Sequence, residues 1–130
     1  MDKDFSDWML VKRKINNNAG RPLYREREVW WCSVGSNVGY EADGKGKDYV
    51  RPVLILKDFN HTVFWAVPMT TQLKSGKYYF DIDLSSGISA QIMLSQLRFI
   101  DSKRLHQKIE MIDKEVFIKI KQAIADLFLQ

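Results

Sequence analysis

The residues whose types suggest chemistry are an arginine and a threonine, each placed near a proline. Arg51 precedes Pro52, where a polar, glycine-dotted loop gives way to the apolar run Val53–Leu56. Proline keeps the residue before it out of the α region, so Arg51 is expected to be extended at the start of a strand. Its guanidinium is a permanent cation with a planar fork of donors that matches a phosphate or a carboxylate. This pattern predicts an anion site; an edge-strand charge in a surface ion pair is the alternative.

Thr70 lies shortly after Pro68, which follows a second apolar run over residues 62–67. The proline is expected to force an edge, a bulge or a strand end just before Met69, and so to release Thr70 from simple pairing. If the two strands pair antiparallel across their short turn, Arg51 and Thr70 become spatial neighbours. Together they could hold a phosphodiester and stabilise the charge that develops during displacement. A surface arginine beside a turn threonine is the alternative that composition alone favours.

A long loop over residues 35–49 leads to Arg51 and holds Lys45 and Lys47 among several glycines. Loops of this length in compact domains are usually functional or mobile. The loop matches neither the GxxxxGK[ST] nor the GxGxxG pattern, so we do not expect a nucleotide-binding loop. We assign the two lysines to contacts with a polyanion, which the net charge of +4 suits without requiring it.

The elements that must position these residues are short strands between two helices. Asp4 is expected to cap a helix over residues 4–15, and breaker residues over 16–22 form a linker. In the last strand the apolar parity slips at Ser95-Gln96, which predicts a bulge. Asp113 is expected to begin a C-terminal helix that packs on the sheet. The strands are predicted over residues 28–34, 51–56, 62–67, 77–84 and 90–99.

Because this order lacks βαβ alternation, we predict a mainly β fold with α elements, a small, strongly bent antiparallel β-barrel. We divide the 130 residues into an N-terminal helix and linker, residues 1–24, and a barrel domain, residues 25–130. Cys32 is the only cysteine and lies in an apolar run, which predicts a buried thiol in a reducing compartment. With neither a signal-peptide pattern nor an apolar run of membrane-spanning length, we expect a cytoplasmic protein without membrane contact.

Five motifs follow one another along the chain: Glu28–Trp31, Gly39–Glu41 with Arg51–Leu54, Val67–Gln72, Leu94–Asp101 and Arg104-Leu105. In this order they resemble the landmarks of the MazF/PemK/Kid toxins, and the resemblance spans residues 27–128. It implies an SH3-like barrel that forms a homodimer and cleaves single-stranded RNA without a metal or other cofactor. It also implies a separate antitoxin that inhibits the toxin. The helix and linker before residue 25 lie outside the family core.

By this resemblance Arg51 is the catalytic arginine, Thr70 the phosphate-binding hydroxyl and Glu41 a candidate for acid–base catalysis. The implied reaction is attack of the ribose 2′-oxygen on the adjacent phosphorus, which leaves a cyclic phosphate and a free 5′-hydroxyl. It needs charge stabilisation and proton transfer but no cofactor. Because arginine is a poor base at its ordinary pKa, we assign Arg51 chiefly to electrostatic stabilisation, and the group that takes the first proton stays open. The spacing from Glu41 to Arg51 is longer than is usual in the family.

The resemblance also makes Gln96 an RNA contact, and we assign Thr71 and Gln72 to the same role. Ser95, just before that glutamine, replaces a usual acidic residue of the family. Two rival functions stay open. A CcdB-like toxin that poisons a topoisomerase would use the same barrel, but such toxins lack the Arg-Pro plus threonine pairing found here. A barrel that binds nucleic acid or protein without catalysis is the second rival.

Other candidate sites are weaker. Asp81 and Asp83 share an exposed strand face, but without a third ligand they predict a solvated surface and no metal site. His61 and His106 have no cysteine or carboxylate at ligand spacing and are expected at the surface. Four tryptophans could include a base-stacking platform, although tryptophan in apolar runs more often packs in a core: Trp8, Trp30, Trp31 and Trp65.

The N-terminal helix carries an apolar stripe that must dock somewhere, because a helix this short is not stable alone. Docking on its own barrel would make it a brace, whereas docking across a dimer or near the 35–49 loop would make it a gate over RNA. Lys12, Arg13 and Lys14 favour a position where they also meet RNA, although a solvated charge run is the alternative. The stripe consists of Phe5, Trp8, Val11 and Ile15.

Overall fold

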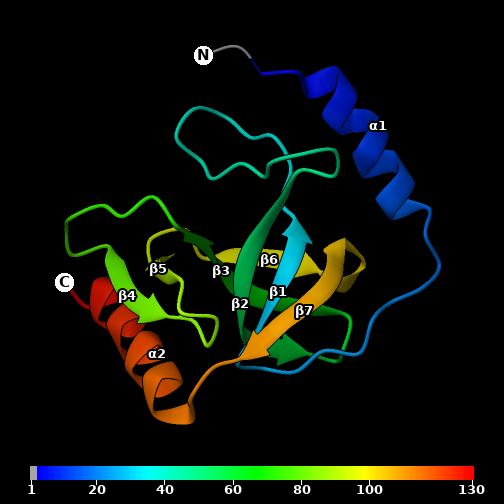
Figure 1. Cartoon of the computed structure of the whole chain (residues 1–130). Coiled ribbons are helices and arrows are strands. Elements are labelled where there is room, and N and C mark those ends of the chain that lie inside the picture. Colours follow the sequence, from blue (N-terminus) through cyan, green and yellow to red (C-terminus); the bar gives the residue numbers. More distant parts are fainter. Residues whose placement is uncertain (1–2) are drawn as a thin grey trace.

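The computed structural model describes residues 3–130, a mainly antiparallel β protein with a helix near each end (Figure 1). The Asp4 carboxylate accepts a 2.9 Å hydrogen bond from the backbone N–H of Asp7, and Asp113 caps the second helix in the same way. Both predicted helices are confirmed. Neither helix in the described range is long and apolar enough to cross a membrane. In chain order the elements are α1 (Phe5–Asn16), β1 (Glu28–Ser33), β2 (Val50–Phe59), β3 (Val63–Thr70), β4 (Tyr79–Asp83), β5 (Ser89–Met93), β6 (Arg98–Asp101), η1 (Ser102–Arg104), β7 (Leu105–Met111) and α2 (Lys114–Phe128).

In the part of the chain that the structure describes, seven strands form one sheet. The strand order is β4-β5-β3-β2-β1-β7, and β6 pairs with β3 off this path. Every pairing is antiparallel. Within residues 3–130 no pairing joins β4 to β7, so the curved sheet of Figure 1 stays open. The predicted mainly β architecture is confirmed, and the predicted barrel is realised only loosely.

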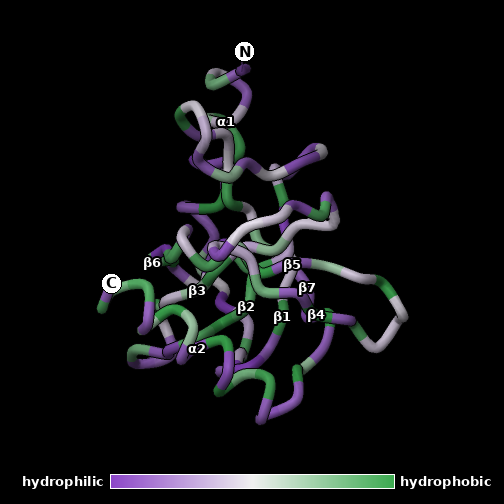
Figure 2. The backbone as a smooth tube through the Cα atoms, turned by 90° about the vertical axis from the view of Figure 1, so that its left-hand side faces the viewer, coloured by the Kyte–Doolittle hydropathy of each residue, from purple (hydrophilic) through white to green (hydrophobic). Residues whose placement is uncertain are grey.

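β2 lies between β1 and β3, and the middle of this strand is buried on both faces. Leu54 and Leu56 belong to a core cluster with Phe117 of α2, so the C-terminal helix packs on the sheet as predicted. Val53 and Ile55 belong to a second cluster on the opposite face. A strand covered on both faces needs a continuous apolar run and not an alternating one. Figure 2, turned from Figure 1, shows α1 and α2 at opposite ends of the molecule.

β3 changes neighbours along its length, and this corrects the predicted bulge at Ser95-Gln96. The first half of β3, residues 63–66, pairs with β6, whereas Met69 and Thr70 pair with β5. The chain must therefore cross from one neighbour to the other. It does so through a turn after Met93, where the backbone N–H of Gln96 donates to the Met93 carbonyl at 3.1 Å. The parity slip marks the end of one strand and the start of the next.

Pro68 lies inside β3 and does not end it, which corrects a second prediction. It is opposite Val53 of β2. On its other side it falls between the β6 and β5 pairings, so its missing N–H interrupts neither of them. Thr70 is therefore not released from pairing; it is paired with Gln91 of β5.

β7 is a strand that the sequence pattern does not predict. It pairs with β1 at the outside of the sheet, and most of its side chains, including His106, are exposed. An outer strand with solvated side chains lacks the apolar alternation that reveals a strand.

The structure also tests the predictions for the two histidines and the cysteine. The predicted surface positions of His61 and His106 are confirmed. Cys32 of β1 is fully buried as predicted, and burial raises the pKa of its thiol to about 12.

Candidate functional site

Arg51 and Thr70 lie together at one end of the β2–β3 pair. Val53 is opposite Pro68, and continuing this antiparallel register toward the loop places Arg51 opposite Thr70. Nη1 of Arg51 donates a hydrogen bond of 3.1 Å to the carbonyl oxygen of Met69, the residue before Thr70. Both side chains line one cleft of about 400 Å³. The predicted proximity of the arginine and the hydroxyl is confirmed.

Two backbone carbonyls hold the guanidinium of Arg51. In addition to Met69, the carbonyl oxygen of Asp43 accepts a 2.7 Å hydrogen bond from Nε. A guanidinium carries five N–H donors, and within residues 3–130 no protein group accepts from Nη2. Partial burial lowers the pKa of Arg51, and the negative charge of Asp43 opposes that shift. The ordinary pKa of an arginine side chain is so far above neutral pH that Arg51 stays cationic despite this shift. The cleft therefore contains a fixed cation with unused donors.

The Thr70 hydroxyl is oriented by the chain that follows it. Its Oγ1 accepts a 3.1 Å hydrogen bond from the backbone N–H of Gln72. A hydroxyl that accepts one bond keeps its own proton, so Thr70 can donate to an anion in the cleft. Thr71 and Gln72 are exposed and line the same cleft. The structure thus brings together five of the residues predicted to act on RNA: Lys45, Arg51, Thr70, Thr71 and Gln72.

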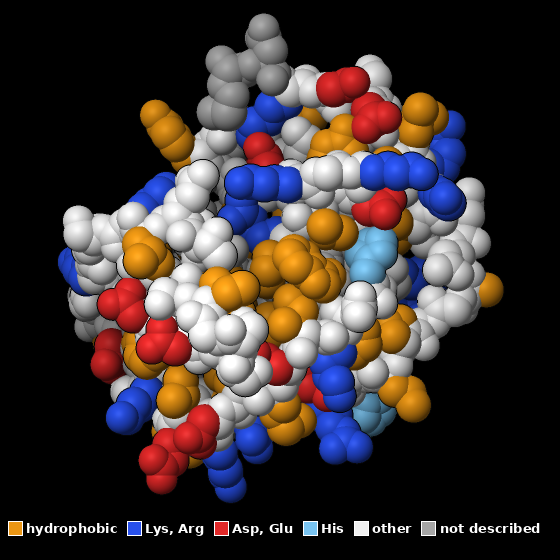
Figure 3. Space-filling model, viewed as in Figure 1, with side chains coloured by type: hydrophobic (Ala, Val, Ile, Leu, Met, Phe, Trp, Pro, Cys, Tyr) orange, Lys and Arg blue, Asp and Glu red, His pale blue; other side chains and the backbone are white. Residues whose placement is uncertain are grey.

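The cleft combines this polar edge with an apolar wall. Trp31, Pro52 and Leu84 line it, and the exposed Lys45 lines it as well, beside Gly46. Figure 3 shows hydrophobic side chains gathered over β1 and β2, below a strip of the surface that carries basic side chains. A nucleotide offers a flat apolar base and a charged phosphate, and this combination of surfaces suits both parts.

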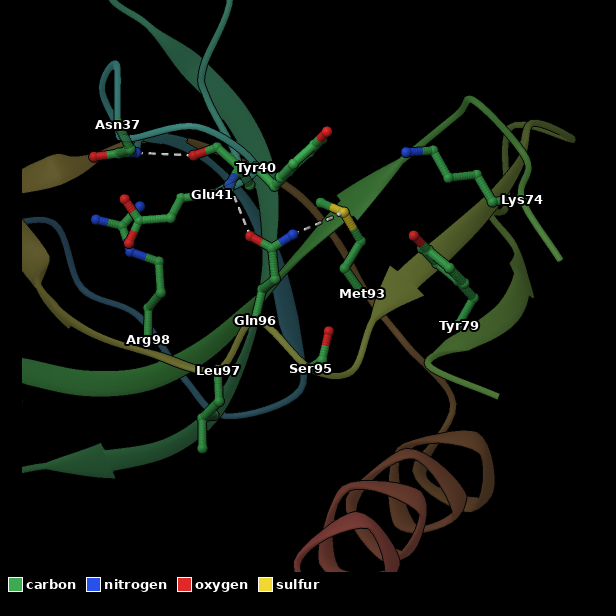
Figure 4. A pocket seen from close by; sticks show the side chains of 11 residues that line it. Asn37, Tyr40, Glu41, Lys74, Tyr79, Met93, Ser95, Gln96, Leu97 and Arg98 are labelled. Carbon is green, nitrogen blue, oxygen red and sulfur yellow. Dashed lines mark hydrogen bonds between the residues drawn. The ribbon is translucent and has the colours of Figure 1, made fainter. Parts of the chain in front are cut away.

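Glu41 and Gln96 lie in a neighbouring pocket of about 640 Å³ and not in the arginine cleft (Figure 4). Glu41 accepts a 2.9 Å hydrogen bond from the backbone N–H of Val38, and so caps a turn of the loop. Gln96 accepts a 2.7 Å bond from the backbone N–H of Ala42. In Figure 4 the Glu41 side chain points toward the Arg98 side of the pocket. The structure therefore does not bring Glu41 to Arg51.

The two lysines of the loop occupy different positions. The backbone of Lys45 is tied to Val50 by two hydrogen bonds of 2.8 and 3.0 Å, which fixes this lysine next to the start of β2. Lys47 is exposed in the turn that follows and lines neither pocket. Of this pair, the structure places only Lys45 at the arginine cleft.

The acidic residues considered for a metal site have other partners. Asp81 accepts a 2.8 Å hydrogen bond from Nε2 of Gln91, and Asp83 accepts one of 2.9 Å from the Ser89 hydroxyl. Across the described range, residues 3–130, no group of three His, Cys, Asp or Glu side chains is placed to hold a metal ion.

Sequence reasoning missed two features of the cleft, the carbonyl of Asp43 and the exposed face of Trp31. Nothing in the sequence marks Asp43, because every residue has a carbonyl. Trp31 could have been separated from the core tryptophans by strand alternation, since it points away from the face that Trp30 occupies. Trp31 and Trp65 are 40% and 45% exposed, so these two tryptophans do not pack in the core, whereas Trp30 belongs to a core cluster and Trp8 is buried outside both clusters.

Residues 25–128 match the sequence pattern of a known family, described as PemK-like, MazF-like toxin of type II toxin-antitoxin system. The chain belongs to this family. The matched region contains both pockets and begins after α1. The N-terminal helix is therefore a feature of this PemK/MazF-like chain that lies outside the matched region.

Individual relatives agree with this assignment. The chain is 28% identical over 112 residues to Endoribonuclease EndoA of Bacillus subtilis (strain 168), covering 78% of this chain and 91% of that protein. The MazF structure from Deinococcus radiodurans superimposes with a TM-score of 0.70 at 19% identity, covering 84% of this chain and 99% of that one. A mycobacterial endoribonuclease solved in complex with its cognate antitoxin gives a TM-score of 0.58 at 18% identity, covering 81% and 92%. These structural matches support the fold.

Proposed function

We propose that this PemK/MazF-like chain is an endoribonuclease that cleaves single-stranded RNA without a metal. The observation that carries the proposal is the pairing of Arg51 and Thr70 in one cleft, with Nη2 donors of the arginine unused. The relative from Bacillus subtilis is named an endoribonuclease, which supports the same activity. An RNA phosphodiester is an anion of the size and charge that this donor set would bind.

The residues of the cleft have distinct parts in the proposed reaction. Nη2 of Arg51 and the Thr70 hydroxyl bind the phosphate oxygens and stabilise the negative charge that grows as the ribose 2′-oxygen attacks phosphorus. The bond from phosphorus to the 5′-oxygen breaks, which leaves a cyclic phosphate and a 5′-hydroxyl. The carbonyls of Asp43 and Met69 keep the guanidinium in place before the substrate arrives, so little reorganisation is needed during the reaction.

Proton transfer requires a group that the cleft itself does not supply. Within residues 3–130 the cleft lining holds no carboxylate and no imidazole. Glu41 is separated from Arg51 because its carboxylate caps a turn in the neighbouring pocket. An acid–base role for Glu41 would need a rearrangement of the loop between β1 and β2, residues 34–49. Without one, water takes the proton of the 2′-hydroxyl and supplies the proton that the leaving 5′-oxygen needs.

RNA contacts beyond the reacting phosphate are assigned to side chains on either side of the loop. Lys45, Thr71 and Gln72 line the arginine cleft, and we assign them to contacts with the adjacent nucleotide. Gln96 lines the neighbouring pocket and would hold a nucleotide further along. Lys47 is exposed and lines neither pocket, so it would contribute to RNA binding mainly through its charge.

Digestion of a defined RNA in the presence of EDTA tests the proposal. We expect internal cleavage with a cyclic phosphate on one product and a 5′-hydroxyl on the other. An RNA with a single 2′-O-methyl group at the mapped position should resist cleavage there, because the attacking oxygen is blocked. Cleavage that requires Mg²⁺ or leaves a 5′-phosphate would overturn this mechanism.

The proposed activity also implies partner proteins and a cellular location. The mycobacterial relative was solved with a cognate antitoxin, and by analogy we propose an antitoxin protein for this chain, with a homodimer as its working form and the cytoplasm as its location. We also propose that residues 25–130 form the catalytic unit and that residues 1–24 are an appendage.

Two outcomes of the RNA digestion would favour a rival function. If RNA stays intact while DNA supercoiling by a topoisomerase is blocked, the CcdB-like rival is favoured. If RNA is bound and never cut, the non-catalytic rival is favoured.

A further inference from the structure

The N-terminal helix α1 lies alongside the loop between β1 and β2, at the end of the molecule opposite α2. Figures 1 and 2 show this placement from two directions. The loop it touches, residues 34–49, is the same loop whose Asp43 carbonyl holds Arg51. α1 contacts this loop near its start and its end, and Lys3, which precedes the helix, contacts its middle.

At the start of the loop, Trp8 packs on Gly35. Trp8 is 6% exposed, and it is the buried residue of α1. A Cβ at position 35 would lie 2.4 Å from two indole carbons, and the φ of Gly35 is +89°. The Arg104 guanidinium also lies over this indole ring, 5.7 Å from its centroid. Only glycine allows the helix to approach the loop this closely.

In the middle of the loop, Lys3 is held by three acceptors. Its Nζ lies 2.9 Å from Oδ2 of Asp43 and donates to the carbonyl oxygens of Asn37 and Gly39, the latter at 3.2 Å. An ammonium group has three N–H donors, so these contacts satisfy all of them. The Lys3 side chain is only 8% exposed. A lysine this buried is stabilised by fixed partners, and it fixes them in return.

At the end of the loop, Tyr49 joins α1 to the start of β2. Its hydroxyl donates a 2.5 Å hydrogen bond to Asp7 of α1, and this bond is the main reason that the pKa of Tyr49 is raised to about 12. The ring lies 5.4 Å from that of Trp8. Tyr49 has a φ of +53° and precedes Val50 and Arg51 directly. The carbonyl of Tyr49 also accepts bonds from the backbone N–H groups of Val34 and Gly35, which closes the loop.

We propose that α1 with Lys3 is a positioning element for Arg51, acting through the 34–49 loop. Lys3 fixes the Asp43 side chain, and the Asp43 carbonyl fixes Nε of Arg51, so one residue links the N-terminal segment to the cleft. Among residues 3–130, none that line the cleft belongs to α1, so the helix acts through the loop and not by touching RNA there. The inference rests on the proposed function of Arg51.

The sharpest variant is Lys3→Met, which removes the ammonium group and keeps most of the stem. Lys14→Met is the matched control, because Lys14 is an exposed lysine of α1. Lys3→Arg restores the charge. The first measurement is the hydrogen-exchange rate of the Arg51 Nε–H in the NMR spectrum, assigned by its loss in Arg51→Lys. We expect faster exchange in Lys3→Met and in Trp8→Ala, and wild-type exchange in Lys14→Met.

The second measurement is cleavage of a defined RNA. We expect kcat to fall about tenfold or more in Lys3→Met while KM for RNA changes little, because the donors remain and only their placement is lost. Lys3→Arg should recover most of kcat, which a general loss of stability would not predict. Circular dichroism checks that each variant is folded.

The two measurements separate this inference from the proposed function. Unchanged Arg51 Nε–H exchange in both Lys3→Met and Trp8→Ala overturns the inference, whether or not the wild-type protein cuts RNA. Faster exchange with unchanged kcat also overturns it. A wild-type protein that cuts no RNA would count against the proposed function, and the exchange rates would then decide alone whether α1 positions Arg51.

Discussion

The carbonyl oxygen of Asp43 accepts a 2.7 Å hydrogen bond from Nε of Arg51. A second carbonyl, from Met69, accepts from Nη1, so the loop before β2 and the end of β3 hold one guanidinium between them. Both acceptors belong to the main chain, and their positions follow from backbone conformation. The placement of Arg51 therefore depends on the loop as a whole, whereas its chemistry depends on donors that the protein leaves unused.

Arg51→Ala is expected to lower RNA cleavage by about a hundredfold or more, because a preorganised donor that stabilises developing charge is lost. Arg51 is half-buried and belongs to neither core cluster, so the variant should remain folded. Arg51→Lys keeps a charge without the planar fork and should recover only part of the rate. Cleavage of end-labelled RNA gives the rates, and circular dichroism checks the fold. A wild-type rate in Arg51→Ala would remove Arg51 from the mechanism.

Thr70→Val is expected to reduce cleavage more than Thr71→Val, since valine keeps the branched shape and removes the hydroxyl. Thr70 Oγ1 also accepts from the backbone N–H of Gln72, so its loss disturbs the turn after β3 as well. Thr71 is exposed and is not paired in β3. Parallel rate measurements on the two variants test the assignment. If Thr71→Val is the more damaging change, the wrong hydroxyl has been placed on the phosphate.

The proximity of Arg51 and Thr70 could be predicted from sequence because it depends on local rules. Two apolar runs joined by a short turn pair antiparallel, and the register of such a hairpin places the first strand's start near the second strand's end. The apolar run of β2 likewise reflects burial on both faces of a central strand. Where strand pairing depends on segments that are close in the chain, the sequence pattern is sufficient to predict it.

The features that sequence missed depend on contacts between distant segments. A parity slip at Ser95-Gln96 follows equally from a bulge or from a turn. The structure has a turn there, because β3 pairs with β6 along its first half and with β5 at its end. Pro68 was expected to force an edge, a bulge or a strand end, yet it lies inside β3, between the β6 and β5 pairings on one side of the strand. Glu41 is close to Arg51 in the chain but is turned into a separate pocket by its hydrogen bond to Val38.

Cys32 is expected to resist thiol reagents in the native protein. Its side chain is fully buried, and burial raises the pKa of the thiol to about 12, so little of the reactive thiolate forms at mildly alkaline pH. In denaturant the pKa returns to its ordinary value and the thiol should react quickly. Labelling with a chromogenic disulfide reagent, with and without denaturant, measures both rates. Fast labelling of the native protein would show that β1 opens readily.

A homodimer is expected in solution, as the family resemblance implies. The described surface carries aromatic side chains that one chain does not cover: Trp65 and Phe99 are paired across β3 and β6 and are 45% and 64% exposed. Phe59 lies against Trp65 with ring centroids 5.2 Å apart. Exposed apolar surface of this kind is common at sites of association. Sedimentation at micromolar concentration should give the mass of two chains, and a monomer alone would contradict the prediction.

Deleting residues 1–20 is expected to leave a folded protein with altered RNA affinity. Neither core cluster of the described chain includes a residue of α1, so both cores should survive the deletion. The truncation removes the exposed cations Lys12, Arg13 and Lys14, and if these contact phosphates, the salt dependence of RNA binding should become shallower. Thermal unfolding and RNA binding at two salt concentrations, compared with the full chain, measure both effects. A triple substitution of the three cations by glutamine, with α1 intact, is the control that separates lost charge from a lost helix. A truncated protein that aggregates or unfolds would show instead that Trp8 and its helix are an integral part of the fold.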